Sequence, residues 1–198
     1  MSILQTAGLS GAARSVPCKV IAPFAGEVPG LVQGSPAARA TGAQVVMMAG
    51  VIAERPNWDG VVCEVGPRTL WAHVSAGEVV SFASFVSVEV AEGLQAIADE
   101  GFEDGLQVTL SRPERLAGEL AEADVTPGRA WGALLGAELA AARPYWLGQE
   151  VILVGQGPVD GFYAQALQSQ GAMLKRMESG AAFDAGQAAL LAEKGTLS

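Results

Sequence analysis

The clearest hydrophobic pattern lies in the middle of the chain, where apolar and polar positions alternate with a period of two. This alternation is typical of half-buried strands and predicts three in succession, at residues 61–65, 69–74 and 79–86. Gly66-Pro67 and Ser75-Ala76-Gly77 supply turn residues between these strands. Because such short connections join neighbouring strands, we expect an antiparallel meander.

A second pattern, at residues 150–171, predicts a strand, a turn and a helix. Residues 151–154 form an unbroken apolar run, as expected for a strand buried on both faces of a parallel or mixed sheet. Gly155 and Gly157 allow a tight turn, and Pro158 suits the first turn of the helix. The backbone N–H groups of such a turn can bind a nucleotide, although glycines needed only for the fold give the same pattern.

The rest of the chain divides into helical segments, one further strand and irregular connections. Apolar residues with helical spacing predict helices at residues 37–54, 89–98, about 112–123, 126–142 and 181–191, and a strand at 172–177. Glycines and prolines are so frequent in residues 1–36 that we expect irregular structure there, with at most a short strand at 19–22. Residues 99–105 are acidic and broken by glycine, which predicts a connection.

The resulting order is β-β-β-α, then inserted helices, then α-β-α-β-α. This order predicts an α/β protein with a ribonuclease H-like domain, the building block of the sugar kinase, hexokinase and actin superfamily. We expect residues 59–198 to form this C-terminal domain, and residues 1–58 to form an irregular segment followed by a connecting helix. No internal repeat indicates a second copy of the domain.

Composition and charge exclude several classes of protein. Hydrophobic residues make up 50% of the 198-residue chain, which excludes a disordered protein. The net charge of −9, with only 12 basic residues, argues against nucleic acid or a membrane surface as a partner. Cys18 and Cys63 are widely spaced, and no apolar run is long enough to span a bilayer. The start of the chain lacks the features of a signal peptide, so we expect a reduced, cytoplasmic protein.

Three runs of sequence resemble the second half of the 2-dehydro-3-deoxygalactonokinases. These are DGVVCEVGPRTLWAHVSAGEVVSF at residues 59–82, GALLGAELAAARPYWLGQEVILVG at 132–155 and FYAQALQSQGA at 162–172. The resemblance covers the chain from about Pro29 onward. It implies a sugar-kinase fold, and it implies phosphorylation of 2-dehydro-3-deoxy-D-galactonate with ATP and a divalent metal such as Mg²⁺, in galactonate breakdown. A sugar acid and a nucleotide are therefore the implied small-molecule partners.

The sequence departs from the family at the charged ends of its motifs. Family members carry an N-terminal domain with an Asp-x-Gly-Thr-type turn. From the resemblance we expect this chain to begin after that part and residues 1–58 to be a remnant of the first kinase domain. Where the family shows Arg-Gly-Glu-Glu, residues 42–45 are Gly, Ala, Gln and Val, which carry no charge. Where the family shows Thr-Gly-Glu-Leu, residues 87–90 keep only the acid Glu89.

A third family motif, Pro-Gly-Thr-His-x-Lys-Trp, corresponds to residues 65–71. Gly66 and Trp71 match it, whereas Pro67, Arg68 and Leu70 occupy the Thr, His and Lys positions. Phosphoryl transfer depends on positioning and on neutralising charge. Because Pro67 has no N–H to offer a phosphate and Val45 cannot hold a metal or a proton, these changes predict a weak or inactive enzyme.

The residues that the resemblance and the turns single out are few. For cofactor binding they are Gly66, Thr69, Gly155 and Gly157. We assign no catalytic residue, and only Arg68 and Glu89 are candidates. Arg68 can bind phosphate as a fork donor, or it can be an ordinary solvated charge. Glu89 can be a base, or it can be an acid favoured by the start of a helix.

The remaining chemistry of the sequence is sparse. His73 is the only histidine, and it lacks a Ser or Cys partner at a telling spacing. No cluster of His and Cys predicts a metal site. Two hypotheses for function remain open. The chain is either a 2-dehydro-3-deoxygalactonokinase-like enzyme with weak or no activity, or a non-catalytic module derived from that kinase that binds ligands or forms a homo-oligomer through its apolar surface.

Overall fold

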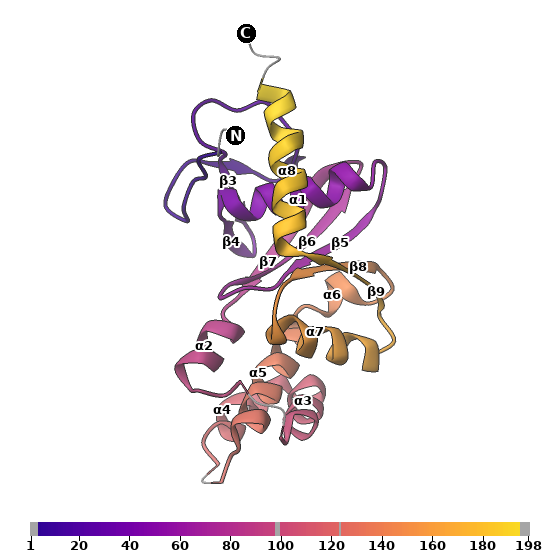
Figure 1. Ribbon diagram of the computed structural model, residues 1–198. Coiled ribbons are helices and arrows are strands. Elements are labelled where there is room, and N and C mark those ends of the chain that lie inside the picture. Colours follow the sequence, from indigo (N-terminus) through magenta and orange to yellow (C-terminus); the bar gives the residue numbers. More distant parts are fainter. Residues whose placement is uncertain (1–3, 98–99, 123, 195–198) are drawn as a thin grey trace.

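The computed structural model describes residues 4–97, 100–122 and 124–194. Within these residues the strands form a 3-stranded and a 6-stranded sheet, and helices cover both faces of the larger sheet (Figure 1). The larger sheet contains β2 (Cys18–Lys19), β5 (Gly60–Glu64), β6 (Thr69–Ser75), β7 (Glu78–Phe85), β8 (Glu150–Gly155) and β9 (Met173–Glu178). Their order across the sheet is β2-β7-β6-β5-β8-β9.

The central strands confirm both patterns that the sequence predicts. β5, β6 and β7 pair antiparallel as a meander, and β8 pairs parallel with both β5 and β9. The chain is therefore an α/β protein with a mixed sheet. Every residue of β5 is buried, as are residues 151–155 of β8. Burial on both faces is why residues 151–154 form a continuous apolar run, whereas β5 buries the acid Glu64 at its end.

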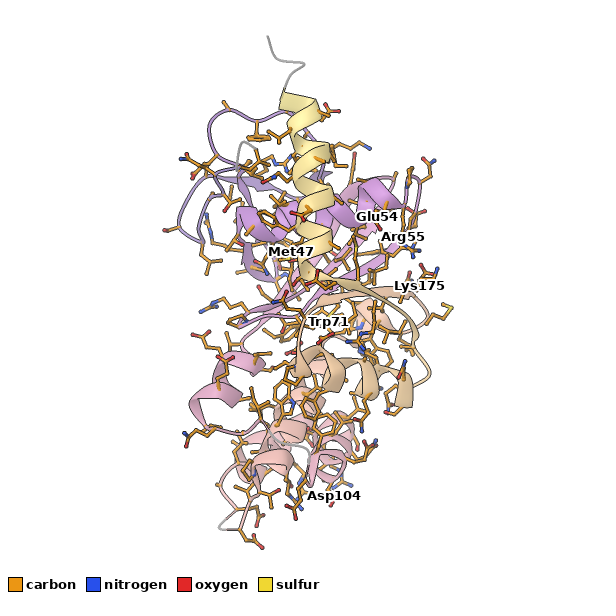
Figure 2. The ribbon with its side chains drawn as sticks, viewed as in Figure 1. Met47, Glu54, Arg55, Trp71, Asp104 and Lys175 are labelled. Carbon is orange, nitrogen blue, oxygen red and sulfur yellow. The ribbon has the colours of Figure 1, made fainter. Side chains whose placement is uncertain are left out.

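Two hydrophobic cores lie on opposite faces of this sheet. Along β5, Val61 and Cys63 face one core and Val62 faces the other, because successive side chains of a strand alternate. The Val62 face is covered by α1 (Gly42–Glu54) and α8 (Ser179–Lys194). The opposite face is covered by α2 (Ser87–Gly93), α3 (Phe102–Ser111), α5 (Pro127–Ala141), α6 (Arg143–Trp146) and α7 (Pro158–Ser169). In Figure 2, Met47 of α1 and Trp71 of β6 mark these two sides.

Helices α1 and α8 cross at very short range, although they are far apart in the sequence (Figure 1). A Cβ atom added at Gly50 of α1 would lie 1.9 Å from the carbonyl oxygen of Ala182, and one added at Gly186 of α8 would lie 1.8 Å from that of Val46. Only glycine fits at these positions. The contact holds α1 firmly over the sheet, and the start of α1 belongs to the site described below.

The N-terminal segment is more regular than its glycines and prolines suggest. The irregular structure expected for residues 1–36 is wrong in part, because within the described residues 4–36 β1 (Ala13–Ser15) and β3 (Gly30–Gly34) are strands, which form the 3-stranded sheet with β4 (Ala37–Ala40). The short strand expected at 19–22 is instead β2 at 18–19, which pairs with β7. The helix expected from residue 37 begins at Gly42, because residues 37–40 pair with β3.

The region between β7 and α5 also differs from the sequence prediction. The helix expected at 89–98 is the shorter α2, and residue 98 lies outside the described residues. The connection expected at 99–105 is partly helical, because α3 begins at Phe102 with Glu103 and Asp104 in its first turn, where acids favour a helix. In the segment expected as one helix at about 112–123, the structure has a 3₁₀ turn (Pro113–Arg115) and the one-turn helix α4 (Leu116–Glu119).

The C-terminal predictions agree well with the structure. The helix expected at 126–142 is α5, which begins after Thr126, whose side chain accepts a hydrogen bond from the N–H of Arg129 at 3.2 Å. The strand expected at 172–177 is β9, and the helix expected at 181–191 is α8. Both helices are long, and the existence of long helices is what sequence patterns predict most reliably.

Candidate functional site

The candidate site lies where the parallel strands end. β5, β8 and β9 run in the same direction, so Glu64, Gly155 and Glu178 lie along one edge of the sheet. From β5 the chain continues into β6 on one side, whereas β8 lies on the other. The strand order therefore changes direction at this point, and open α/β sheets bind their ligands in the crevice at such a switch point.

A pocket of about 540 Å³ opens beside the end of β5. The start of α1 supplies Thr41, Gln44 and Met47 to its lining, and α2 supplies Glu89 and Glu92. The remainder of the wall is residues 64–68, which form the end of β5 and the turn to β6. A volume of this size is typical of sites for small molecules.

The side chain of Gln44 connects the start of α1 to this turn. It forms a capping box with Thr41, in which the backbone N–H of Gln44 donates to Thr41 Oγ1 at 3.2 Å and the N–H of Thr41 donates to Gln44 Oε1 at 3.0 Å. Its Nε2 also donates to the carbonyl oxygen of Arg68 at 3.4 Å. Val45, in contrast, is fully buried in the core beneath α1. The family positions that Gln44 and Val45 occupy therefore bring no charge to this pocket.

Glu64 is the buried polar group of the pocket wall, and sequence reasoning missed it. Its exposed fraction is 2%, and neither carboxyl oxygen has a hydrogen-bond partner among the described residues. It pairs with Leu70 of β6 and Val154 of β8, both apolar. Burial raises the pKa of the Glu64 carboxyl well above its ordinary value of 4.5. The sequence does contain a signal for a buried acid at this position. Side chains alternate along β5, so Glu64 lies on the same face as the core residue Val62.

Arg68 and Glu89 meet at the rim of the pocket. Their side chains form an ion pair at 3.7 Å between Arg68 Nη2 and Glu89 Oε2, and each side chain is about half exposed. The backbone N–H of Glu89 also donates to the carbonyl oxygen of Pro67 at 3.3 Å. The structure thus brings both catalytic candidates to the pocket, beside Gly66. An ion pair this exposed holds its members weakly, so the guanidinium is able to turn toward a ligand.

Thr69 does not line this pocket. Its side chain points into the opposite core, where its Oγ1 lies 3.0 Å from the hydroxyl of Tyr163. That hydroxyl donates to Glu138 Oε2 at 2.9 Å, and the indole N–H of Trp71 donates to Glu138 Oε1, also at 2.9 Å. Burial raises the pKa of Glu138, and hydrogen bonds from Ser87, Trp71 and Tyr163 oppose this shift. Thr69 and Trp71 therefore belong to a buried hydrogen-bond network that joins β6, α5 and α7.

Gly155 and Gly157 lie at the same sheet edge, on the side of α7. Gly155 ends β8, where a Cβ atom would lie 2.7 Å from the Cβ of Asp160. Gly157 precedes α7 with a φ of 92°, a conformation that favours glycine. Neither residue lines the 540 Å³ pocket. Asp160 forms an ion pair with Arg176 of β9, so the start of α7 is fixed to the sheet.

Other candidates lie elsewhere or are not brought together. His73 lines a different pocket of about 490 Å³, with Phe85 and Tyr145. Among residues 4–97, 100–122 and 124–194, no group of three or more His, Cys, Asp or Glu side chains could hold a metal ion. A search of the helices in the same residues finds none long and apolar enough to cross a membrane.

The fold and the pocket define an α/β protein with a mixed sheet and a candidate small-molecule pocket at the end of β5. The sequence model of the 2-keto-3-deoxy-galactonokinase family matches residues 7–190. The chain belongs to this family. A crystal structure of a protein from Sinorhizobium meliloti, provisionally assigned as a 2-dehydro-3-deoxygalactonokinase, is similar to it with a TM-score of 0.75 and 21% sequence identity. The similarity covers 90% of this chain and 73% of that protein.

Two further comparisons add little. Component A of (R)-2-hydroxyglutaryl-CoA dehydratase from Acidaminococcus fermentans gives a TM-score of 0.41 with 17% identity, over 77% of this chain and 68% of that one. No curated protein matches the sequence. At 21% identity, the Sinorhizobium structure supports the fold, and membership of the family rests on the match to the family model.

Proposed function

We propose that this chain acts as a sugar-acid kinase that transfers phosphate from ATP to 2-dehydro-3-deoxy-D-galactonate, at a low rate. The observation that carries the proposal is the pocket at the end of β5, in a chain of the 2-keto-3-deoxy-galactonokinase family. The pocket has the volume of a small-molecule site, and it lies at the sheet edge where α/β proteins of this kind bind ligands.

In this proposal the two ligands lie on different sides of the sheet edge. The sugar acid occupies the pocket between α1, the β5–β6 turn and α2. The nucleotide binds near Gly155 and Gly157, where the N-terminus of α7 presents backbone N–H groups and a partial positive charge. Gly66 lines the pocket that the sugar acid would occupy.

The low rate follows from the charges that line the pocket. Phosphoryl transfer concentrates negative charge, which other groups must neutralise. Among the described residues the pocket has one cation, Arg68, beside the acids Glu64, Glu89 and Glu92. Mg²⁺ does not fit a site made by the described residues alone, because they contain no group of three or more His, Cys, Asp or Glu side chains that could hold it. Any Mg²⁺ would therefore have to arrive bound to the phosphates of the nucleotide.

We also propose a ribonuclease H-like fold and a cytoplasmic location for this chain. The strand order β7-β6-β5-β8-β9 supports a ribonuclease H-like domain over residues 59–198, and residues 1–58 add β2 to its sheet and α1 to one of its faces. Cys18 and Cys63 are both free thiols, which supports a reducing compartment such as the cytoplasm.

A second candidate function is binding without phosphoryl transfer, either of ligands or of a second copy of the chain. The favouring observation is at the α1 end of the pocket, where Val45 is buried and Gln44 is occupied by the helix cap and the turn. Neither side chain can remove a proton from a hydroxyl group.

A coupled assay of ADP release tests the proposed kinase. Release of ADP that depends on 2-dehydro-3-deoxy-D-galactonate supports it, and an Arg68→Gln variant should lower the rate. Calorimetric titration with Mg-ATP and with the sugar acid separates the two candidates, since a module binds at least one ligand without turnover. If neither ligand binds at millimolar concentration, the kinase and the ligand-binding module are both wrong. Self-association then remains, and light scattering tests it.

A further inference from the structure

The carboxyl group of Glu64 combines three properties that seldom occur together. It is 2% exposed, it has no hydrogen-bond partner among the described residues, and it lines a pocket open to small molecules. A buried polar group without a partner destabilises a fold. It recovers the missing hydrogen bonds when a ligand with matching polar atoms enters the pocket.

The neighbours of Glu64 decide which form of the carboxyl group is present. On the sheet it lies between Leu70 and Val154, and α1 offers the pocket only the neutral side chains of Thr41, Gln44 and Met47 within the described part of the chain. The charged groups that line the same pocket are Arg68, Glu89 and Glu92.

None of these charges neutralises a Glu64 carboxylate. Arg68 forms an ion pair with Glu89 at the rim, and Glu89 and Glu92 are acids themselves. Burial without a cationic partner favours the neutral acid, in agreement with the raised pKa of Glu64. A neutral carboxyl group offers one O–H donor together with acceptor oxygens.

A ligand hydroxyl group complements this arrangement, because it both accepts and donates a hydrogen bond. The charges of the pocket further restrict which ligands can bind. With Glu64 neutral, the carboxylates of Glu89 and Glu92 outnumber the one arginine and repel a polyphosphate, whereas a hydroxylated monoanion needs only Arg68 for its one charge. A sugar acid has this combination of several hydroxyl groups and one carboxylate.

We propose that Glu64, as the neutral acid, binds a hydroxyl group of the sugar acid and is a specificity-determining residue of the pocket. The inference rests on the proposed function and assigns to it a residue from β5. Glu64 selects ligands that carry a hydroxyl group at this depth, because a ligand without one leaves the carboxyl group unpaired.

Calorimetric titration with 2-dehydro-3-deoxy-D-galactonate tests the proposal on the wild type, Glu64→Gln and Glu64→Leu. Leucine cannot form hydrogen bonds, so Glu64→Leu should weaken binding about tenfold or more. The glutamine amide both donates and accepts, so Glu64→Gln should remain within about threefold of the wild type. Titration with Mg-ATP is the control, and its affinity should be the same in all three proteins.

The pH dependence and the melting temperature provide independent readouts. Wild-type affinity for the sugar acid should fall as pH rises through the pKa of Glu64, and Glu64→Gln should lose this dependence. Both variants should melt at or above the wild-type temperature at alkaline pH, because they remove a buried group that tends to ionise. A residue needed only for folding would instead lower the melting temperature when replaced.

Several results would overturn the assignment. Unchanged sugar-acid affinity in Glu64→Leu would do so, as would an affinity loss confined to Mg-ATP, or sugar-acid binding that strengthens with rising pH. A wild type that binds Mg-ATP but not the sugar acid would overturn the role of Glu64 and leave nucleotide binding standing. A failure of the kinase assay with intact, Glu64-dependent sugar-acid binding would reject only the transfer step.

Discussion

The hydroxyl group of Tyr163 donates a hydrogen bond to Glu138 at 2.9 Å, and so joins α7 to α5 under the sheet. Both residues are buried, and the acceptor is an acid whose pKa is raised by burial. The indole of Trp71 satisfies the other oxygen of Glu138, and Thr69 contacts the tyrosine hydroxyl. One buried acid thus holds together β6, α5 and α7.

We expect Tyr163→Phe to destabilise the protein by about 1–3 kcal/mol, because it leaves a buried Glu138 oxygen without its partner. Urea denaturation measures this free energy of unfolding. Tyr145→Phe is the matched control, since Tyr145 is only partly buried, and it should change the free energy by less than about 0.5 kcal/mol. Equal effects of the two substitutions would contradict the importance of the network.

Gly50→Ala should also destabilise the fold, by about 1–3 kcal/mol or more, because the new methyl group would overlap the carbonyl oxygen of Ala182 and push α1 away from α8. Gly161→Ala is its control within α7, where no atom lies within 4 Å of the added Cβ. This control should stabilise the helix by about 0.5–1 kcal/mol. Thermal denaturation compares the two, and a stable Gly50→Ala protein would disprove the close packing.

The pH dependence of stability should show a contribution from Glu150. Its carboxylate accepts a hydrogen bond from the indole of Trp58 at 2.9 Å, and it pairs with Lys175 at 2.8 Å and with Arg55 at 3.3 Å. Figure 2 shows Arg55 and Lys175 on the same side of the molecule. These partners, Lys175 foremost, lower the pKa of Glu150 below its ordinary value of 4.5.

Because the folded pKa of Glu150 is lowered, its contribution is present above the unfolded value and is lost as pH falls through the folded value. Glu150→Gln should therefore lower the melting temperature near neutral pH, by the equivalent of about 1 kcal/mol. The difference from the wild type should vanish at strongly acidic pH. A difference that persists or grows in acid would show that the ion pairs are not its cause.

Arg68→Gln should weaken binding of the sugar acid about tenfold, because the hydrogen bonds of a charged donor to an oxyanion are strong. The melting temperature should stay within about 1–2 °C of the wild type, since Arg68 is half exposed and weakly paired. Calorimetric titration measures the affinity. Arg112→Gln serves as the control at an exposed arginine outside the pocket, and an equal effect of both substitutions would point to net charge alone.

The sequence predicts those parts of the fold in which local pattern and tertiary structure agree. Residues 151–154 are apolar because both faces of β8 are covered. Within the meander, β5 and β6 are almost wholly buried, and only β7 has an exposed position. The N-terminal strands were missed for a physical reason. β3 pairs in parallel with β1 across a long connection and antiparallel with β4 after residues 35–36, but the glycines and prolines around these short strands hide their pattern in the sequence.

The site was predicted only in part for a related reason. Arg68, Glu89 and Gly66 stand out in the sequence as remnants of motifs, and the structure places all three at one pocket. The sequence marks Thr69 as a candidate beside Gly66, but in the structure its side chain points into the opposite core. Glu64 ends a strand and looks like an ordinary acid until its neighbours are known. The depth of a side chain depends on segments that fold over it from elsewhere in the chain.

The close crossing of α1 and α8 has a consequence for biosynthesis. During translation, residues 42–54 leave the ribosome well before residues 179–194. The apolar surface of α1 that α8 covers therefore stays exposed until α8 is made. The backbones of α1 and α8 approach so closely at Gly50 and Gly186 that α8 must dock on α1 in one defined position. The nascent chain should therefore need chaperone protection until α8 emerges.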